Sequence, residues 1–132
     1  MGIRFNMIGV FVNDLTKMVA FYRDVLGLEI EWDGKGPYAE FKHEPIRFSM
    51  YERKLLSEFL GRTPTYPNGL NGTFELAIEL PKFEQVDIEF ERAVKAGAQP
   101  VTPPKDTPWS QRTSYVADPE GNLIEIGSFN QG

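Results

Sequence analysis

The sequence predicts an α+β fold made of two βαβββ repeats, which form a curved, cup-like mixed sheet with the helices on the outside. Two observations support this prediction. A strand pattern, a helical stripe and several short extended pieces occur in the same order in each half of the 132 residues. In each half the helical stripe ends at a glycine, Gly27 and then Gly97, and glycine tolerates the left-handed conformation at a helix end better than any other residue.

The first half begins with an apolar strand over residues 5–12. Side chains alternate between the two faces of a strand, so Ile8, Val10 and Val12 are expected to face the helix. Asn13 and Asp14 offer a helix N-cap, because a short side-chain oxygen can accept an unpaired backbone N–H. After Gly27, glycine and proline turns separate three short extended pieces, which are residues 28–32, 38–42 and 46–51.

Residues 55–71 differ from the segments on either side. Several apolar residues at the start indicate a short helical turn, and prolines and glycines then interrupt regular structure. We interpret this segment as a connector within a single domain that covers residues 1–132. The first repeat is then 1–54, the linker 55–71 and the second repeat 72–132.

The second half repeats the order of elements. A strand over residues 74–80 places Glu75 and Ala77 on one face, and a helical stripe follows from residue 83. We expect an extended stretch at 98–102 and a proline-rich loop at 103–108 that leads to Trp109. Two final strands, at 113–117 and 122–126, are joined by a turn at 118–121 that contains proline and glycine.

Glu125 is the most informative residue of the predicted inner face. It stands between aliphatic residues, where an unpaired carboxylate is costly to bury, so it needs a cation, a network of donors or a raised pKa. The alternative is a solvated edge position or an ion pair with Arg47 or Arg112. Glu75 is similar, with a solvent-facing role as its alternative. Trp109 and Arg112, beside the proline-rich loop, are candidates for the mouth of the site or for packing.

Composition excludes several classes of protein and site. The chain has no cysteine, which excludes disulfides, thiolate metal sites and a cysteine nucleophile. Its one histidine, His43, stands in a turn. With 19 acidic and 14 basic residues the net charge is −5, which disfavours nucleic acid as a partner. We find no nucleophile elbow, phosphate loop or dinucleotide fingerprint. No apolar run approaches a membrane span, so we expect no membrane partner and a cytoplasmic location.

Two segments resemble a known family. Residues 21–28, Phe-Tyr-Arg-Asp-Val-Leu-Gly-Leu, are similar to the first-helix signature of the vicinal oxygen chelate superfamily. Residues 115–125, which contain Asp-Pro-Glu-Gly-Asn-Leu-Ile-Glu, resemble its final hairpin and strand. The group includes glyoxalase I, methylmalonyl-CoA epimerase, extradiol dioxygenases, fosfomycin-resistance enzymes and bleomycin-resistance proteins. The resemblance covers nearly the whole chain, but it does not select one activity.

The resemblance also implies where a metal would bind. Metal-using members take ligands from the first and last strands of the repeats, and these positions hold Met7, Ser49, Glu75 and Glu125 here. Met7 stands where the family usually has a histidine. A thioether is a soft ligand that suits copper better than the harder divalent ions of these enzymes. This departure weakens the expectation of the family's chemistry, in which a metal polarises adjacent substrate oxygens.

We therefore predict a metal-independent protein, without a cofactor, that binds a cationic or aromatic small molecule in an acidic cup, as bleomycin-resistance proteins do in kind. The alternative is a lyase, isomerase or dioxygenase that holds Mn, Ni, Fe or Zn with Glu75 and Glu125, and a third possibility is metal-free acid–base chemistry at these carboxyls. Whether the protein is an enzyme stays open, and the resemblance implies a homodimer. The predicted site has Glu125 and Glu75 as its chemically active residues and these ligand contacts: Met7, Phe5, Phe11, Ser49, Arg47, Trp109 and Arg112.

Overall fold

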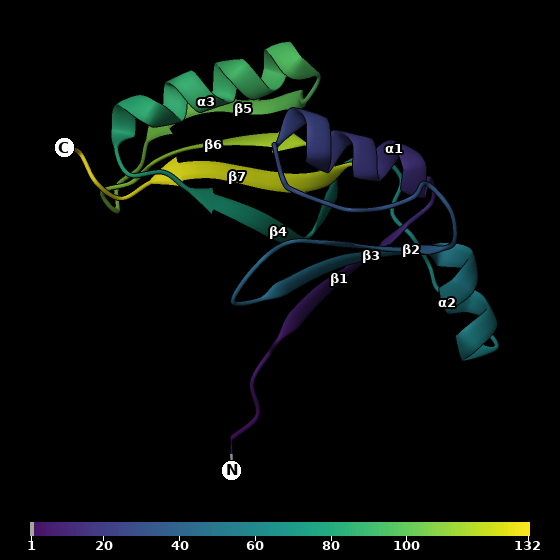
Figure 1. Ribbon diagram of the computed structural model, residues 1–132. Coiled ribbons are helices and arrows are strands. Elements are labelled where there is room, and N and C mark those ends of the chain that lie inside the picture. Colours follow the sequence, from purple (N-terminus) through teal and green to yellow (C-terminus); the bar gives the residue numbers. More distant parts are fainter. Residues whose placement is uncertain (1) are drawn as a thin grey trace. The chain divides into compact units, whose positions relative to one another are not determined.

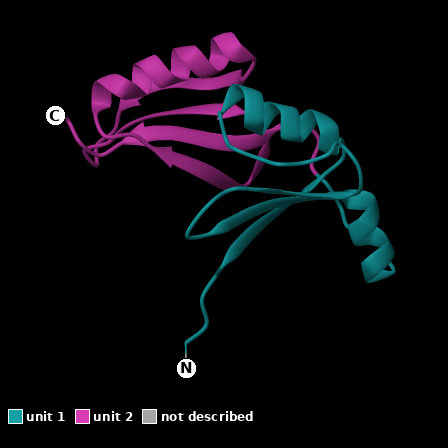
Figure 2. Cartoon of the chain, viewed as in Figure 1, with its two compact units in different colours: residues 1–66 teal, residues 67–132 magenta. Residues whose placement is uncertain are grey.

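The computed structural model describes residues 2–132, and the chain divides into two units between Tyr66 and Pro67 (Figure 2). This division falls inside the segment 55–71 that we interpret as a connector. Each unit contains one mixed sheet with its own helices (Figure 1), which confirms the predicted α+β class. None of the described helices is both long enough and apolar enough to span a bilayer.

The first unit contains a three-stranded sheet in the order β1-β3-β2, in which β1 runs parallel to β3 and β2 runs antiparallel to it. A π-helical segment, η1, directly continues helix α1. The elements of this unit are β1 (Met7–Val12), α1 (Leu15–Ala20), η1 (Phe21–Val25), β2 (Tyr38–Phe41), β3 (Arg47–Glu52) and α2 (Arg53–Leu60).

The first strand and helix form for the reasons that the sequence indicates. Asp14 caps α1 by accepting the backbone N–H of Lys17 at 3.0 Å. Val10 and Val12 are buried on one face of β1, as expected for the side that the helix covers. Tyr22 of η1 packs against the rings of Phe41 and Phe48, with centroid distances of 6.1 and 5.4 Å.

Two segments of the first unit differ from the prediction. Residues 28–32 do not form a strand, because only Ile30 makes a bridge, to Phe41, before the chain turns away. The turn is held by the Asp33 carboxylate, which accepts the N–H of Lys35 at 2.9 Å. The helical turn expected at the start of the connector is longer than predicted, since α2 already begins at Arg53 and ends at Gly61, with φ of 71°.

The second unit contains a four-stranded sheet in the order β4-β7-β6-β5. Strand β4 pairs parallel to β7, whereas β6 pairs antiparallel with both β7 and β5. Helix α3 packs on β5, β6 and β7 (Figure 1), and Ile124 and Ile126 are buried on that side. The elements are β4 (Asn71–Glu79), α3 (Phe83–Ala96), β5 (Gln99–Asp106), β6 (Arg112–Ala117) and β7 (Asn122–Ser128).

The proline-rich segment is a strand rather than the predicted loop. Strand β5 continues through Pro103 and Pro104 to Asp106. This is possible because β5 is at the edge of its sheet, where a residue without an N–H leaves no central ladder bond unmade. The register against β6 shifts twice along this strand, between Pro100 and Lys105.

The turn between β6 and β7 ties the hairpin to the start of β4. The buried Asp118 carboxylate accepts the backbone N–H groups of Glu120 and Asn122 and the side-chain amide of Asn122, at 2.9 to 3.1 Å. Gly121 has a φ of 87°, and its carbonyl accepts the N–H of Asn71 at 2.7 Å. A Cβ at Gly121 would lie 2.0 Å from the carbonyl oxygen of Gly69, so no other residue fits without movement of the backbone.

We expect Gly121→Ala to destabilise the protein far more than Gly36→Ala. Both glycines have positive φ, which costs an alanine roughly 1–2 kcal/mol. Only at Gly121 does the new methyl group also meet backbone, so its total loss should reach about 3 kcal/mol or more. Urea unfolding of both variants measures the difference, and equal losses would contradict the close approach of the hairpin to Gly69.

Candidate functional site

The open face of the second sheet, on the side away from α3, carries the two predicted carboxyls. Ala77 of β4 is opposite Glu125 of β7, and Glu75 is opposite Leu123. Tyr115 of β6 is opposite Glu125 from the other side. Because side chains alternate along each strand, Glu75, Tyr115 and Glu125 share the face that the buried isoleucines of β7 do not use.

Neutral donors hold both carboxyl groups, and we call this set the carboxyl network. The hydroxyl of Tyr115 donates to Oε1 of Glu75 at 2.9 Å. The hydroxyl of Thr113 donates to Oε2 of Glu125 at 2.7 Å, and the amide nitrogen of Gln111 donates to the same oxygen at 3.3 Å. The sequence indicates that Glu125 needs a cation, a network of donors or a raised pKa, and the structure shows that a network of donors is present.

The two carboxyls also affect each other. Partial burial and a hydrogen bond with the Glu125 carboxyl raise the pKa of Glu75, while the hydrogen bond from Tyr115 opposes this rise. Burial and the neighbouring carboxyls raise the pKa of Tyr115 to about 12, so this hydroxyl remains a donor at neutral pH. Glu75 therefore takes up a proton more easily than an isolated glutamate does.

Gly127 makes room for the donors on Glu125. A Cβ at this position would lie 2.7 Å from Oγ1 of Thr113 and 3.0 Å from Nε2 of Gln111. Gly127 is buried on β7, directly opposite Thr113 on β6. Sequence reasoning missed Gly127, Thr113, Gln111 and Tyr115. The alternation of β6 could have placed Thr113 and Tyr115 on the same face as Glu125. No local sequence pattern indicates that Gly127 is needed there.

The matching face of the first sheet carries a different pair. Gly9 of β1 is opposite Ser49 of β3, and Met7 is opposite Arg47. Ser49 is fully buried, and its hydroxyl donates to Sδ of Met7 at 3.4 Å. Phe11 lies on this face as well and contacts the ring of Tyr51, with 6.2 Å between the centroids. Phe5 precedes β1 and is exposed.

The two predicted arginines each bind a carboxylate that is not part of the carboxyl network. Arg47 makes two hydrogen bonds to Glu40, at 2.7 and 2.8 Å, and this pairing lowers the pKa of Glu40 to about 2. Arg112 faces α3 rather than the carboxyl network, because it binds Asp87 at 2.7 and 2.8 Å and Asp106 at 2.9 Å. The prediction that Arg112 lines the mouth of the site beside Trp109 is therefore wrong, as is its suggested ion pair with Glu125.

The donor atoms do not fit a hard divalent metal ion in either unit. Within residues 2–132 no group of three or more histidine, cysteine, aspartate or glutamate side chains comes together. The second sheet offers Glu75 and Glu125, whose oxygens already accept hydroxyl and amide hydrogen bonds. The first offers the thioether of Met7 and the hydroxyl of Ser49. Mn²⁺ and similar ions prefer several oxygen or imidazole ligands, and this set lacks them.

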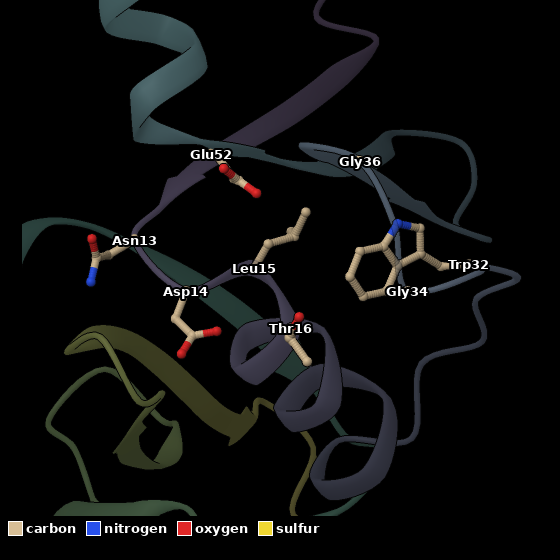
Figure 3. Close-up of a pocket in the computed structure, with 8 residues that line it drawn as sticks. All are labelled: Asn13, Asp14, Leu15, Thr16, Trp32, Gly34, Gly36 and Glu52. Atoms are coloured by element: carbon tan, nitrogen blue, oxygen red, sulfur yellow. The ribbon is translucent and has the colours of Figure 1, made fainter.

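The first unit also contains a polar cavity of about 410 Å³ where β1 leads into α1 (Figure 3). None of the residues that we predict for the site lines it. The Asp14 carboxylate in its wall caps α1, and the indole N–H of Trp32 donates to the carbonyl of Lys35 at 2.9 Å. These polar groups therefore already have structural partners. The lining residues are Asn13, Asp14, Leu15, Thr16, Trp32, Gly34, Gly36 and Glu52.

The raised pKa of Glu75 predicts a pH-dependent loss of stability that Glu75→Gln removes. Between the ordinary carboxyl pKa of 4.5 and the raised native value, the folded protein binds more protons than the unfolded chain, so its unfolding free energy falls as pH rises. The amide is neutral at every pH, so the variant should show a flatter profile over this window. Urea unfolding at a series of pH values measures it. Glu79→Gln, on the same face of β4, is the control, and equal flattening in both variants would contradict a raised pKa at Glu75.

Comparison with known proteins agrees with the fold and with the two sequence motifs. The model of the Glyoxalase/Bleomycin resistance protein/Dioxygenase superfamily matches residues 4–126. The uncharacterized protein YraH of Bacillus subtilis (strain 168) is 33% identical over 122 residues, which is 90% of this chain and 93% of the relative.

Solved structures are similar over almost the same length. A protein of unknown function from Agrobacterium tumefaciens str. C58 has a TM-score of 0.77 at 30% identity, covering 97% of this chain and 95% of that one. A glyoxalase/bleomycin resistance protein/dioxygenase from Nocardioides has a TM-score of 0.85 at 23% identity, covering all of this chain and 87% of the other, and it supports the fold alone. The vicinal oxygen chelate resemblance is thus confirmed, and the chain belongs to the glyoxalase/bleomycin resistance protein/dioxygenase superfamily.

Proposed function

We propose that the protein binds a small cationic or aromatic molecule, without a metal, on the face of the second sheet that carries the carboxyl network. The observation that supports this most directly is the absence of a basic partner. In the described part of the chain, Glu75 and Glu125 bond to neutral donors and to each other, and no arginine or lysine pairs with either. Their negative charge is therefore available to a ligand.

Trp109 supports an aromatic or cationic ligand in particular. It is 63% exposed, although its size would favour burial if packing were its role. Its indole N–H donates to Oε1 of Gln111 at 2.8 Å, and Gln111 in turn donates to Glu125. An exposed ring joined to a carboxylate through one amide side chain offers a surface on which a cation can stack and a charge with which it can pair.

A divalent-metal lyase, isomerase or dioxygenase remains the alternative, with Glu75 and Glu125 as ligands, and the donor set argues against it for the reasons given above. Metal-free acid–base chemistry would use the same carboxyls, with Glu75 as the proton carrier because its pKa is raised.

A homodimer is also proposed, on the family resemblance, and light scattering tests it. The cytoplasmic location stays a prediction from the sequence.

Charge-matched probes test the proposed binding. We expect benzamidinium to raise the melting temperature and benzoate, which has nearly the same shape and the opposite charge, to leave it unchanged. At a concentration 100 times Kd a ligand adds about 2.7 kcal/mol of stability. Glu125→Gln should reduce the benzamidinium shift, while Glu91→Gln, which removes the same charge on α3, should not. Stabilisation by benzoate rather than benzamidinium would overturn the proposal.

Metal content separates the proposal from its alternative. Protein purified without chelator should contain far less than one equivalent of Mn, Ni, Fe or Zn, and EDTA should leave its melting temperature unchanged. Elemental analysis by mass spectrometry and a thermal melt measure both quantities. One equivalent of metal that is lost in Glu125→Gln would establish the metal-dependent alternative in its place.

A further inference from the structure

A strained turn positions two residues of the carboxyl network. Ser110 has a φ of 62°, and within residues 2–132 it is the one residue other than glycine with a positive φ. Such a conformation is unfavourable for a residue that carries a Cβ, so the rest of the structure must compensate for it. Its effect is to bring Trp109 and Gln111 together, so that the indole N–H reaches the amide oxygen two residues later.

The side chain of Gln111 has a defined orientation. It is only 6% exposed, and its amide oxygen is occupied by the indole N–H at 2.8 Å. The amide nitrogen must therefore point toward Oε2 of Glu125, to which it donates at 3.3 Å. Without the indole N–H, the amide could turn and present its oxygen to the carboxylate, which would repel it.

This orientation controls how Glu125 meets a ligand. Thr113 and Gln111 both donate to Oε2, so this oxygen is directed into the sheet. A carboxylate has about four acceptor positions. Thr113 and Gln111 use two of them on Oε2 and the Glu75 carboxyl also bonds to Glu125, which leaves at least one position for a ligand. A carboxylate held by two donors and joined through Gln111 to an exposed indole suits a flat group that carries a positive charge and N–H donors, as amidinium and guanidinium groups do.

We propose that Gln111 is a positioning residue that sets the ligand specificity of this face for flat N–H cations, by joining the ring of Trp109 to the carboxylate of Glu125. This inference rests on the proposed binding function and adds the ligand class and the residue that selects it. Gly127 leaves the space that the Gln111 side chain occupies, because a Cβ at Gly127 would lie 3.0 Å from Nε2 of Gln111.

A purely structural role for this turn makes different predictions. The backbone of the turn is closed by Thr107, whose N–H donates to the carbonyl of Gln111 at 2.8 Å and whose hydroxyl lies 3.2 Å from the Gln111 backbone nitrogen. These bonds do not involve the side chains of Trp109 or Gln111. Changes in those side chains should therefore alter ligand selection more than they alter folding.

Fluorescence of Trp109 tests the proposal without changing the turn. The chain has two tryptophans, so in a Trp32→Phe protein all tryptophan emission comes from Trp109. Three probes of similar shape are titrated: benzamidinium, which is a cation with N–H donors, benzamide, which is neutral with N–H donors, and benzoate, which is an anion. We expect benzamidinium to change the emission with saturation, benzamide to do so at least 10-fold more weakly, and benzoate to have no effect.

Variants of the turn then distinguish a positioning role of Gln111 from a packing role, with binding affinities measured by calorimetric titration. Gln111→Met keeps the length of the side chain but removes both polar ends, and it should reduce the benzamidinium-to-benzamide affinity ratio at least 10-fold. Trp109→Phe keeps a ring but removes the N–H, and it should lower the same ratio while retaining affinity for benzamide. Unfolding curves of both variants should stay close to that of the parent.

Two results would overturn the inference. One is saturable benzamidinium binding, sensitive to Glu125→Gln, that leaves the Trp109 emission unchanged, and the other is an affinity ratio that Gln111→Met does not alter. In both cases the proposed binding function survives, because the cation still binds at Glu125. If none of the three probes binds and none raises the melting temperature, the proposed function fails and this inference fails with it.

Discussion

The alternation of β7 is the constraint on which the candidate site depends. Ile124 and Ile126 are buried under α3, and the residue between them must face the opposite side of the sheet. Moving Glu125 to the helix side would bury a carboxylate among aliphatic groups and expose two isoleucines. Burial of those isoleucines therefore holds the acid in place, at the centre of a sheet whose neighbouring strands supply its partners.

The partners of Glu125 and Glu75 are neutral, and this decides what the face can do. A carboxylate paired with arginine would have its charge cancelled within the protein, as Arg112 does for Asp87. Hydroxyl and amide donors stabilise the carboxylates without removing their charge. Arg112 thus fastens α3 to the sheet through Asp87, while the carboxyls of the opposite face are not paired with a basic residue in the described chain.

The two units show that one order of elements can carry different chemistry. Equivalent strand positions hold Met7 and Ser49 in the first unit and two carboxyls in the second. In the first, the buried hydroxyl is satisfied by a thioether, and the pair adds no charge. The repeat therefore supplies a scaffold, and the side chains at two or three strand positions determine what each sheet can bind.

Local patterns were sufficient for the elements and for the faces of their strands. Period-two alternation placed Val10, Met50, Ile124 and Glu125 on the correct sides, because β1, β3 and β7 each bury residues on one face and a slip by one residue would exchange the two faces. Local patterns gave the wrong element where the position of a segment in the sheet decides whether it forms a strand. The prolines of β5 form a strand because that strand is at an edge, and residues 28–32 do not, because a turn ends their pairing after one bridge.

By itself the sequence determined the α+β class, a similar order of elements in the two halves apart from residues 28–32, and the presence of Glu75 and Glu125 on one face. Only the tertiary structure decided the partners of those carboxyls. Hydrogen bonds from Thr113, Tyr115 and Gln111 join residues 12 to 40 positions apart in the sequence, and they depend on the register between strands and on the space that Gly127 leaves. Such contacts have no local signature, because they arise from distances between strands rather than from the period along any one of them.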